Sequence, residues 1–209
     1  MKFAVIGASR GIGFEIVKFA LLQGHAVRAF ARHRGALTEG TPMLGVFEGD
    51  AMDRSTLQDV VDGADVVCCC IGIPFTRKSV YTFSASTKNI LDAMRKGSAS
   101  RLFCVTGIGA GDSVGHGGFF HDRIMLRTLL KRTYEDKTRQ EELVRGSDVD
   151  WTIVRPGFLT NGPMSVRYRA LTDLTGVTAG RISRADVAHF IVSQADSQNY
   201  RHQAVLLTN

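Results

Sequence analysis

The chain has 209 residues, of which 44% are hydrophobic and 22% are charged. This composition is typical of a globular protein and excludes a disordered chain, and the length predicts a single domain over residues 1–209. The net charge of +6 at pH 7 suits an anionic ligand. Because the basic residues form no continuous run, we expect no nucleic-acid partner.

Neither a membrane span nor a secretory signal is expected. No apolar stretch reaches the roughly 18 residues that a transmembrane helix needs. The N-terminal run meets Gly7 too early for the apolar region of a signal peptide. We therefore expect a cytoplasmic protein with no membrane partner.

Short apolar runs rich in β-branched residues recur along the chain and alternate with helix-like stretches. Such runs are typical of strands that are covered on both faces. The predicted strands span residues 2–6, 26–30, 44–47, 65–70, 101–105 and 151–154. Strict alternation of strand and helix predicts an α/β fold, a Rossmann-type doubly wound parallel sheet with helices on both faces.

The stretches between the strands carry apolar residues at helical spacing. The predicted helices span residues 11–23, 53–61, 79–96 and 120–145. The second of these begins with Asp53, a favourable cap. The last is long for one helix, and Thr133 followed by Asp136 resembles a capping box, so we expect a second start or a kink there.

The tail after Pro156 follows a different pattern. Residues 166–170 are predicted to form a short strand, 183–194 a helix and 204–208 a last strand. Residues 157–209 are too few for a second domain. We expect them to form a small C-terminal substrate cap and the last strand of the sheet.

The four cysteines are Cys68, Cys69, Cys70 and Cys104. None has the two-residue gap of a zinc-binding or redox pair, and all lie in apolar runs. We therefore expect reduced thiols that act as small core hydrophobes, and no metal site.

The first predicted strand leads directly into a glycine loop, residues 7–13, which opens the first predicted helix. Gly7 stands where a Cβ would clash in the tight turn, Gly11 where the backbone approaches a pyrophosphate, and Gly13 where the helix packs close to the sheet. The N–H groups and dipole of the helix start would then face the diphosphate. The predicted dinucleotide-binding residues of this loop are Gly7, Ala8, Ser9, Arg10, Gly11, Ile12 and Gly13.

The end of the second strand predicts the type of cofactor. Residues 28–34 contain no acid that could hold the adenosine ribose of NAD, whereas Arg32 could bind a 2′-phosphate. Arg10 adds a second cation near the same position. We therefore predict NADP, with NADPH preferred over NADH. Arg34 is either a further phosphate contact or a solvated loop residue.

Other strand ends supply further candidate cofactor contacts. Asp50 and Ala51 follow the third strand, where Asp50 either accepts a hydrogen bond from the adenine amino group or caps a turn. After the fourth strand, Cys70, Ile71 and Gly72 either let the backbone lie against the cofactor or form a simple turn. Pro156 either flanks the nicotinamide or merely ends the sixth strand.

Several segments together carry a family resemblance. They are the glycine loop, Gly49-Asp50 before a helix, and residues 87–94, 105–110, 141–145 and 151–157. On these segments the chain resembles the atypical short-chain dehydrogenase/reductases of the NmrA-like, NAD(P)H-binding group, and within it the flavin reductases of the biliverdin reductase B type. The resemblance covers nearly the whole chain and implies a cofactor-dependent oxidoreductase.

The same resemblance implies a catalytic Tyr, a Lys four residues later and a hydroxyl at the end of the fifth strand. Thr106 takes the position of that hydroxyl. Lys137 takes the position of the Lys, where the resemblance implies both a catalytic group and a contact to the nicotinamide ribose. The position of the Tyr is held by Thr133, whereas Tyr134 lies one residue further on. On a helix this shift turns a side chain by about 100°, so Tyr134 reaches the cleft only if the helix is kinked.

A proton could also come from elsewhere. Residues 111–121 form a glycine-rich loop over the carboxyl ends of the strands, in which His121 is a second candidate catalytic residue. It is otherwise an exposed and idle histidine. A flavin-like acceptor could instead take its proton from solvent.

These observations predict an NADPH-dependent oxidoreductase that transfers a hydride to a flat, conjugated small-molecule electron acceptor such as a flavin or a quinone. We expect a monomer or a homodimer. The alternative is a non-catalytic NADP(H)-sensing regulatory protein that binds a partner protein. A sugar-nucleotide epimerase or dehydratase would need a Tyr at position 133 and a larger C-terminal lobe.

Overall fold

The computed structural model describes residues 1–38, 40–74, 76 and 78–209. The strands expected from the sequence are present, and their bounds differ from the prediction by at most a few residues. The strands of the main sheet are β1 Lys2–Ile6, β2 Ala26–Ala31, β3 Leu44–Glu48, β4 Val66–Cys69, β5 Arg101–Val105, β6 Asp150–Pro156, β8 Arg169–Leu171 and β10 Gln203–Thr208.

Within the described residues, the main sheet has eight strands in the order β3-β2-β1-β4-β5-β6-β10-β8. The first six of these positions give the strand order of a Rossmann fold. Every neighbouring pair from β3 to β10 is parallel, and β8 runs antiparallel to β10 at the edge. The predicted fold class is therefore confirmed.

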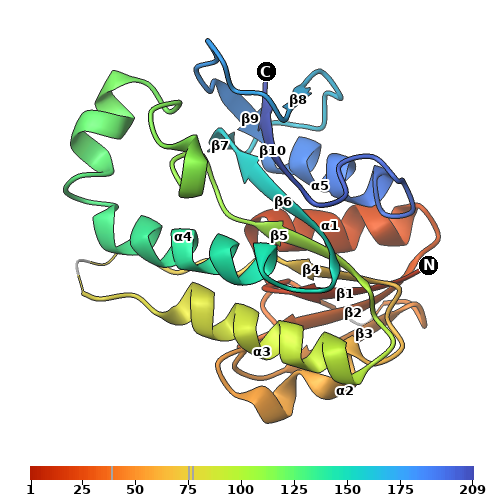
Figure 1. Cartoon of the computed structure of the whole chain (residues 1–209). Coiled ribbons are helices and arrows are strands. Elements are labelled where there is room, and N and C mark those ends of the chain that lie inside the picture. The colour runs from red at the N-terminus through yellow and green to blue at the C-terminus, as the bar shows by residue number, and fades with distance from the viewer. Residues whose placement is uncertain (39, 75, 77) are drawn as a thin grey trace.

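Helices cover both faces of the sheet (Figure 1). One face carries α1 and α5, and the other carries α2, α3 and α4. Their bounds are α1 Gly11–Leu22, α2 Gln58–Val61, α3 Thr82–Lys96, α4 Lys131–Arg145 and α5 Arg184–Ser193. The helix predicted over 53–61 is partly wrong, because it begins with a 3-10 turn, Arg54–Thr56, capped by Asp53, and becomes α-helical only at Gln58.

The long segment over 120–145 is broken, as predicted. A π-helical turn, His121–Met125, precedes α4, which begins at Lys131. The predicted capping box is wrong, because the N-cap of α4 is Leu130 and Asp136, although paired with Arg139 of the same helix, does not cap its start. Its carboxylate is fully buried and accepts a hydrogen bond of 2.8 Å from the Phe83 amide, with further bonds from Ser84. Asp136 therefore caps α3 from the neighbouring α4.

Most of the C-terminal tail completes the main fold. Strands β10 and β8 extend the sheet, and α5 packs against α1. Only β7, Phe158–Thr160, and β9, Arg181–Ser183, form a separate parallel pair. Both were missed in the sequence because three-residue strands leave little pattern. Residues 157–183 are called the C-terminal cap below.

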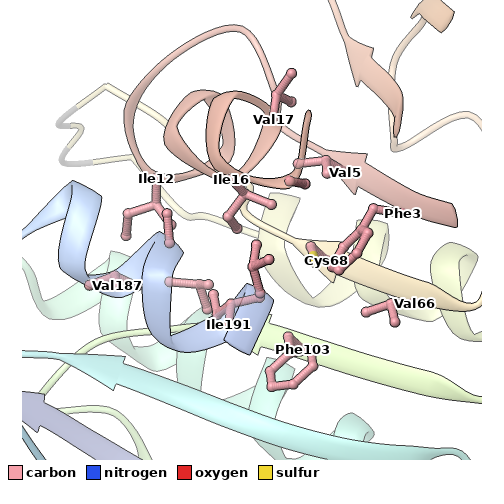
Figure 2. Close-up of a cluster of buried hydrophobic side chains, with 14 of the residues drawn as sticks. Phe3, Val5, Ile12, Ile16, Val17, Val66, Cys68, Phe103, Val187 and Ile191 are labelled. Carbon is pink, nitrogen blue, oxygen red and sulfur yellow. The ribbon is translucent and has the colours of Figure 1, made fainter. Parts of the chain in front are cut away.

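The core has two apolar layers, one on each side of the sheet. Residues of β1 alternate between them: Phe3 and Val5 face α1 and α5, whereas Ala4 and Ile6 face the other helices. Figure 2 shows the first layer, in which Ile12 and Ile16 of α1 lie against Val187 and Ile191 of α5. Cys68, Cys69 and Cys104 are buried in these layers, as predicted, and Cys70 is half-buried. No helix of the described residues is long and apolar enough to cross a membrane.

Removing the Asp136 carboxylate should loosen the contact between α3 and α4. We expect Asp136→Ala to lower the free energy of unfolding by about 2–3 kcal/mol, because it uncaps α3 and leaves buried amides without an acceptor. Urea denaturation measures this change. Glu135→Ala, which removes an exposed ion pair with Arg132, should cost less than about 0.5 kcal/mol. Equal effects of the two variants would contradict the capping role.

Candidate functional site

The carboxyl ends of the parallel strands border a cleft of about 1040 Å³. Its walls are formed by the glycine loop, the ends of β2, β4, β5 and β6, parts of α3 and α4, and the C-terminal cap. This is the edge of an open α/β sheet at which ligands bind.

At two positions of the glycine loop, neighbouring backbone atoms leave no room for a Cβ, which explains why glycine stands there. Gly7 has a φ of +88°, and a Cβ there would lie 2.6 Å from the carbonyl oxygen of Cys70. At Gly13 a Cβ would overlap the carbonyl oxygen of Gly7 and come within 2.9 Å of its carbonyl carbon. The close packing expected at both positions is therefore present. Gly11 has a φ of +63°, and its nearest neighbour on the Cβ side is the Arg184 side chain at 3.9 Å.

The start of α1 presents donors to the cleft. Its N-cap residue, Arg10, makes no side-chain capping bond, and the first turn contains no acid. Ser9, Arg10, Gly11 and Ile12 line the cleft with Gly7. A helix start whose backbone N–H groups have no side-chain cap and border a cleft suits a diphosphate.

Two residues predicted as cofactor contacts stand outside the lining. The methyl group of Ala8 is fully buried, and its amide donates to the carbonyl oxygen of Phe30 at 3.1 Å. Gly13 lies against the Gly7 backbone rather than at the cleft surface. Both residues shape the loop from behind, which corrects the expectation of direct contact.

Cations gather where the adenosine end of a dinucleotide would lie. Arg10 and Arg32 are exposed, line the cleft, and form no ion pair among the described residues. Arg34 instead pairs with Glu48 at 3.3 Å, outside the lining. This ion pair also neutralises the carboxylate of Glu48, the last residue of β3. The cleft therefore offers positive charge for a ligand's anionic group at this end.

The other predicted strand-end contacts line the cleft as well. Asp50, Ala51, Cys70, Ile71, Gly72 and Pro156 are all part of its surface. Asp50 also serves as a turn residue, because its Oδ1 accepts a hydrogen bond of 2.9 Å from the Met52 amide. Asp50 can therefore stabilise the turn and still offer its other carboxylate oxygen to a ligand in the cleft.

Tyr134 and Lys137 both line the far end of the cleft. Residues three apart share a helix face, and the break before α4 sets that face toward the strand ends. Lys137 Nζ donates to the carbonyl oxygen of Thr106 at 2.9 Å and lies 4.4 Å from the centre of the Phe83 ring. The shift from position 133 to 134 therefore does not remove the phenol from the cleft.

Burial changes the proton affinity of both groups. It raises the pKa of Tyr134 to about 12, so the phenol stays protonated at neutral pH. It lowers the pKa of Lys137, although Cys104, Cys69 and Glu141 act in the opposite direction. The pair accordingly holds a neutral phenol beside an amine that binds its proton less strongly than usual.

Thr106 lines the cleft, but its hydroxyl is already engaged. Its Oγ1 donates to Glu141 Oε1 at 2.7 Å. Glu141 is 1% exposed and also accepts from Arg155 Nε at 2.9 Å and from Arg155 Nη2. The hydroxyl that was predicted to be a catalytic group therefore donates to a buried carboxylate instead of into the cleft.

His121 stands behind the site rather than in it. It is 5% exposed and does not line the cleft. Its ring packs edge-on against Tyr134 and Phe158, at centroid distances of 5.9 and 5.5 Å, and Nδ1 lies 3.0 Å from Asp122 Oδ1. The expectation that His121 donates a proton to the substrate is therefore corrected: it supports the Tyr134 ring.

The sequence predicted a C-terminal cap, but it did not indicate which residues of the cap and of α5 reach the cleft. Leu159, Asn161 and Arg184 line the cleft, as does Ser86 of α3, whose buried hydroxyl has no partner among the described residues. A signal for Arg184 exists in the sequence. Ser183 and Asp186 have capping-box spacing, and a basic residue directly after an N-cap opposes the helix dipole.

A doubly wound sheet with a glycine loop and an uncapped helix start at its carboxyl edge defines a Rossmann-type dinucleotide-binding protein. The family model described as NAD(P)H-binding matches residues 7–198, so this chain belongs to that NAD(P)H-binding family. The resemblance to NmrA-like short-chain dehydrogenase/reductases is confirmed.

Individual relatives and a solved structure agree with this family. An uncharacterized chloroplast protein of Arabidopsis thaliana is 30% identical over 172 residues, which are 78% of this chain and 60% of the relative. The uncharacterized sugar epimerase YhfK of Bacillus subtilis is 26% identical, with 100% of this chain and 94% of the relative covered. The structure of ChuY, an anaerobilin reductase from Escherichia coli O157:H7, has 25% identity and a TM-score of 0.84, covering 100% of this chain and 97% of ChuY.

The overlap at Gly13 can be tested directly. Although Ala favours a helix over Gly by about 1 kcal/mol, we expect Gly13→Ala to lower the free energy of unfolding by about 2–3 kcal/mol, because backbone atoms must move. Urea denaturation measures the change. The control is Gly40→Ala, since no atom of the described residues beyond its chain neighbours lies within 4 Å of a Cβ at Gly40. A neutral Gly13→Ala variant would contradict the close packing.

Proposed function

We propose that this protein is an NADPH-dependent reductase that transfers a hydride to a flat, conjugated acceptor such as a flavin or a quinone. One observation carries the proposal: a single cleft joins Arg10 and Arg32 at one end to Tyr134 and Lys137 at the other. The first pair supplies positive charge, since neither arginine forms an ion pair among the described residues. The second pair supplies a proton donor and a positioning amine.

The residues present fit a dinucleotide. The backbone N–H groups of the glycine loop would hold the diphosphate, and a Cβ at Gly7 would disturb this loop by colliding with the Cys70 backbone. Arg32 and Arg10 would hold a 2′-phosphate. Lys137 would contact the nicotinamide ribose. When bound, the reduced nicotinamide supplies a hydride to the acceptor.

Tyr134 holds the proton that the reduced acceptor needs. Burial keeps its hydroxyl protonated, and the adjoining cleft gives that hydroxyl access to a ligand. Lys137 lies on the same helix face, where its ammonium can hold a ligand oxygen while it remains bonded to Thr106. His121 packs against the ring and limits its movement.

Apolar groups near the same end suit a flat acceptor. Ile73, Pro74, Pro156 and Leu159 line the cleft, and a planar ring can stack against such surfaces. The description of ChuY as a reductase supports this choice of reaction. A non-catalytic sensor is the alternative suggested by the absence of Tyr at position 133 and by the small cap, and the presence of Tyr134 in the cleft counters the first of these two points.

The cofactor preference depends on Arg32. We expect wild-type protein to bind NADPH at least tenfold more tightly than NADH, a difference of about 1.4 kcal/mol. Arg32→Ala should abolish this preference by weakening NADPH alone, because only NADPH carries the 2′-phosphate. Calorimetric titration with both cofactors measures the two affinities. Lys88→Ala, which removes one exposed positive charge outside the cleft, is the matched control. Equal wild-type affinities would show that the phosphate site is wrongly assigned.

The role of Tyr134 can be separated from cofactor binding. We expect Tyr134→Phe to lower kcat with a flavin or quinone acceptor by about 100-fold, because the proton donor is lost, while the Kd for NADPH stays unchanged. Since its pKa of about 12 lies above the ordinary value near 10, wild-type activity should not fall through loss of this proton below pH 10. Steady-state NADPH oxidation across pH measures both effects.

The matched control is Tyr168→Phe. Burial also raises the pKa of Tyr168 to about 12, but this residue is bonded to His189 and lies outside the cleft. The kcat of the Tyr168→Phe variant should equal that of the wild-type protein. An unchanged kcat in Tyr134→Phe would mean that solvent supplies the proton. Binding of NADPH without oxidation by any acceptor would favour the sensor.

A further inference from the structure

The Arg184 side chain reaches from the start of α5 to the glycine loop. The Cβ position of Gly11 lies 3.9 Å from Arg184 Nε, and both residues line the same cleft. Gly11 is the first residue of α1, and Arg184 is the first residue of α5. A cation of the C-terminal region therefore stands beside the helix start that offers its amides to the cleft.

Protein contacts leave the charge of Arg184 uncompensated. Its side chain donates from Nη1 to Asn161 Oδ1 at 2.7 Å, and it forms no ion pair among the described residues. A positive charge in the first turn of a helix is disfavoured by the helix dipole. A bound anion at this point would compensate the charge of Arg184 and would reduce its repulsion by the helix dipole. The neutral Asn161 amide does neither.

Packing between α1 and α5 fixes the distance between the two helix starts. Ile12 of α1 and Val187 of α5 belong to one buried cluster and lie close together in Figure 2. Ile12 is directly after Gly11, and Val187 is one turn after Arg184. The apolar contact thus holds the guanidinium at the glycine loop without support from a carboxylate.

We infer that Arg184 binds an anionic group above the glycine loop, namely the diphosphate of the bound dinucleotide. The diphosphate would lie between the amides of α1 and the guanidinium of α5. Asn161 holds the guanidinium on its other side and connects it to the C-terminal cap. This inference rests on the cofactor site of the proposed function, but not on turnover.

The placement has a consequence for cofactor recognition. NADPH and NADH carry the same diphosphate, and only NADPH carries the 2′-phosphate. Arg184 therefore contributes to the affinity for both cofactors equally, whereas Arg32 contributes to the choice between them. The two arginines should be separable by their effects on a set of ligands.

The experiment is calorimetric titration of the whole protein with NADPH, NADH and adenosine 2′-monophosphate. We expect Arg184→Gln to weaken NADPH and NADH by the same factor, about 10- to 100-fold, the range of a charge-assisted hydrogen bond. Binding of adenosine 2′-monophosphate, which lacks the diphosphate, should not change. Arg184→Lys should retain part of the affinity, and it replaces Arg184→Gln if that variant does not fold.

Arg181→Gln is the matched control. Arg181 is an exposed residue of β9 in the same cap and does not line the cleft. The inference is overturned if Arg184→Gln binds both cofactors within twofold of wild type, or if Arg181→Gln weakens them equally. It is also overturned if only the KM for an anionic acceptor rises, because the anion would then belong to the acceptor. Loss of cofactor binding as expected, in a protein that reduces no acceptor, would refute the proposed reaction and leave this inference standing.

Discussion

The buried ion pair between Glu141 and Arg155 organises the end of the cleft that Tyr134 and Lys137 line. Glu141 lies on α4 and Arg155 on β6, and each is at most 2% exposed. Two charges out of water are tolerated only when their hydrogen-bonding groups are satisfied, and here Thr106 and Asp112 complete the set. Proximity to Arg155 helps to hold the pKa of Asp112 below its ordinary value. The pair thereby fixes α4 against β5 and β6, and with it the helix face that carries Tyr134 and Lys137.

Charge is distributed unevenly around the cleft. The buried Glu141 carboxylate and Arg155 guanidinium neutralise one another, whereas Arg10, Arg32 and Arg184 at the surface of the cleft form no ion pair among the described residues. An anionic ligand entering this cleft therefore meets positive charge that the fold has not compensated. This is consistent with a protein of the NAD(P)H-binding family, whose ligand carries several phosphate charges.

The sequence was sufficient for features that depend on local pattern. Strand β4 is an uninterrupted apolar run, and Gly7 and Gly13 occupy a turn whose backbone atoms leave no room for a Cβ. The sequence was insufficient for features that depend on tertiary packing between distant segments. The direction of Tyr134 depends on where α4 begins and on its contact with α3 through Asp136, and neither follows from helix periodicity. Thr106 was predicted to be a catalytic hydroxyl because of the family resemblance, and its actual acceptor, Glu141, is distant in sequence. Arg184 was missed for the same reason, since only the packing of α5 on α1 brings it to the glycine loop.

The protonation state of Tyr134 bears on the direction of the chemistry. Oxidation of an alcohol, which is also the first step of a sugar-nucleotide epimerase, needs a base to accept the hydroxyl proton. With a pKa of about 12, only about one phenol in 10⁵ is ionised at pH 7. A neutral phenol is instead suited to donate a proton to an acceptor that has gained a hydride. This protonation state is the one that the proposed reduction needs, whereas a sugar epimerase, as the relative YhfK is named, needs a base at the hydroxyl.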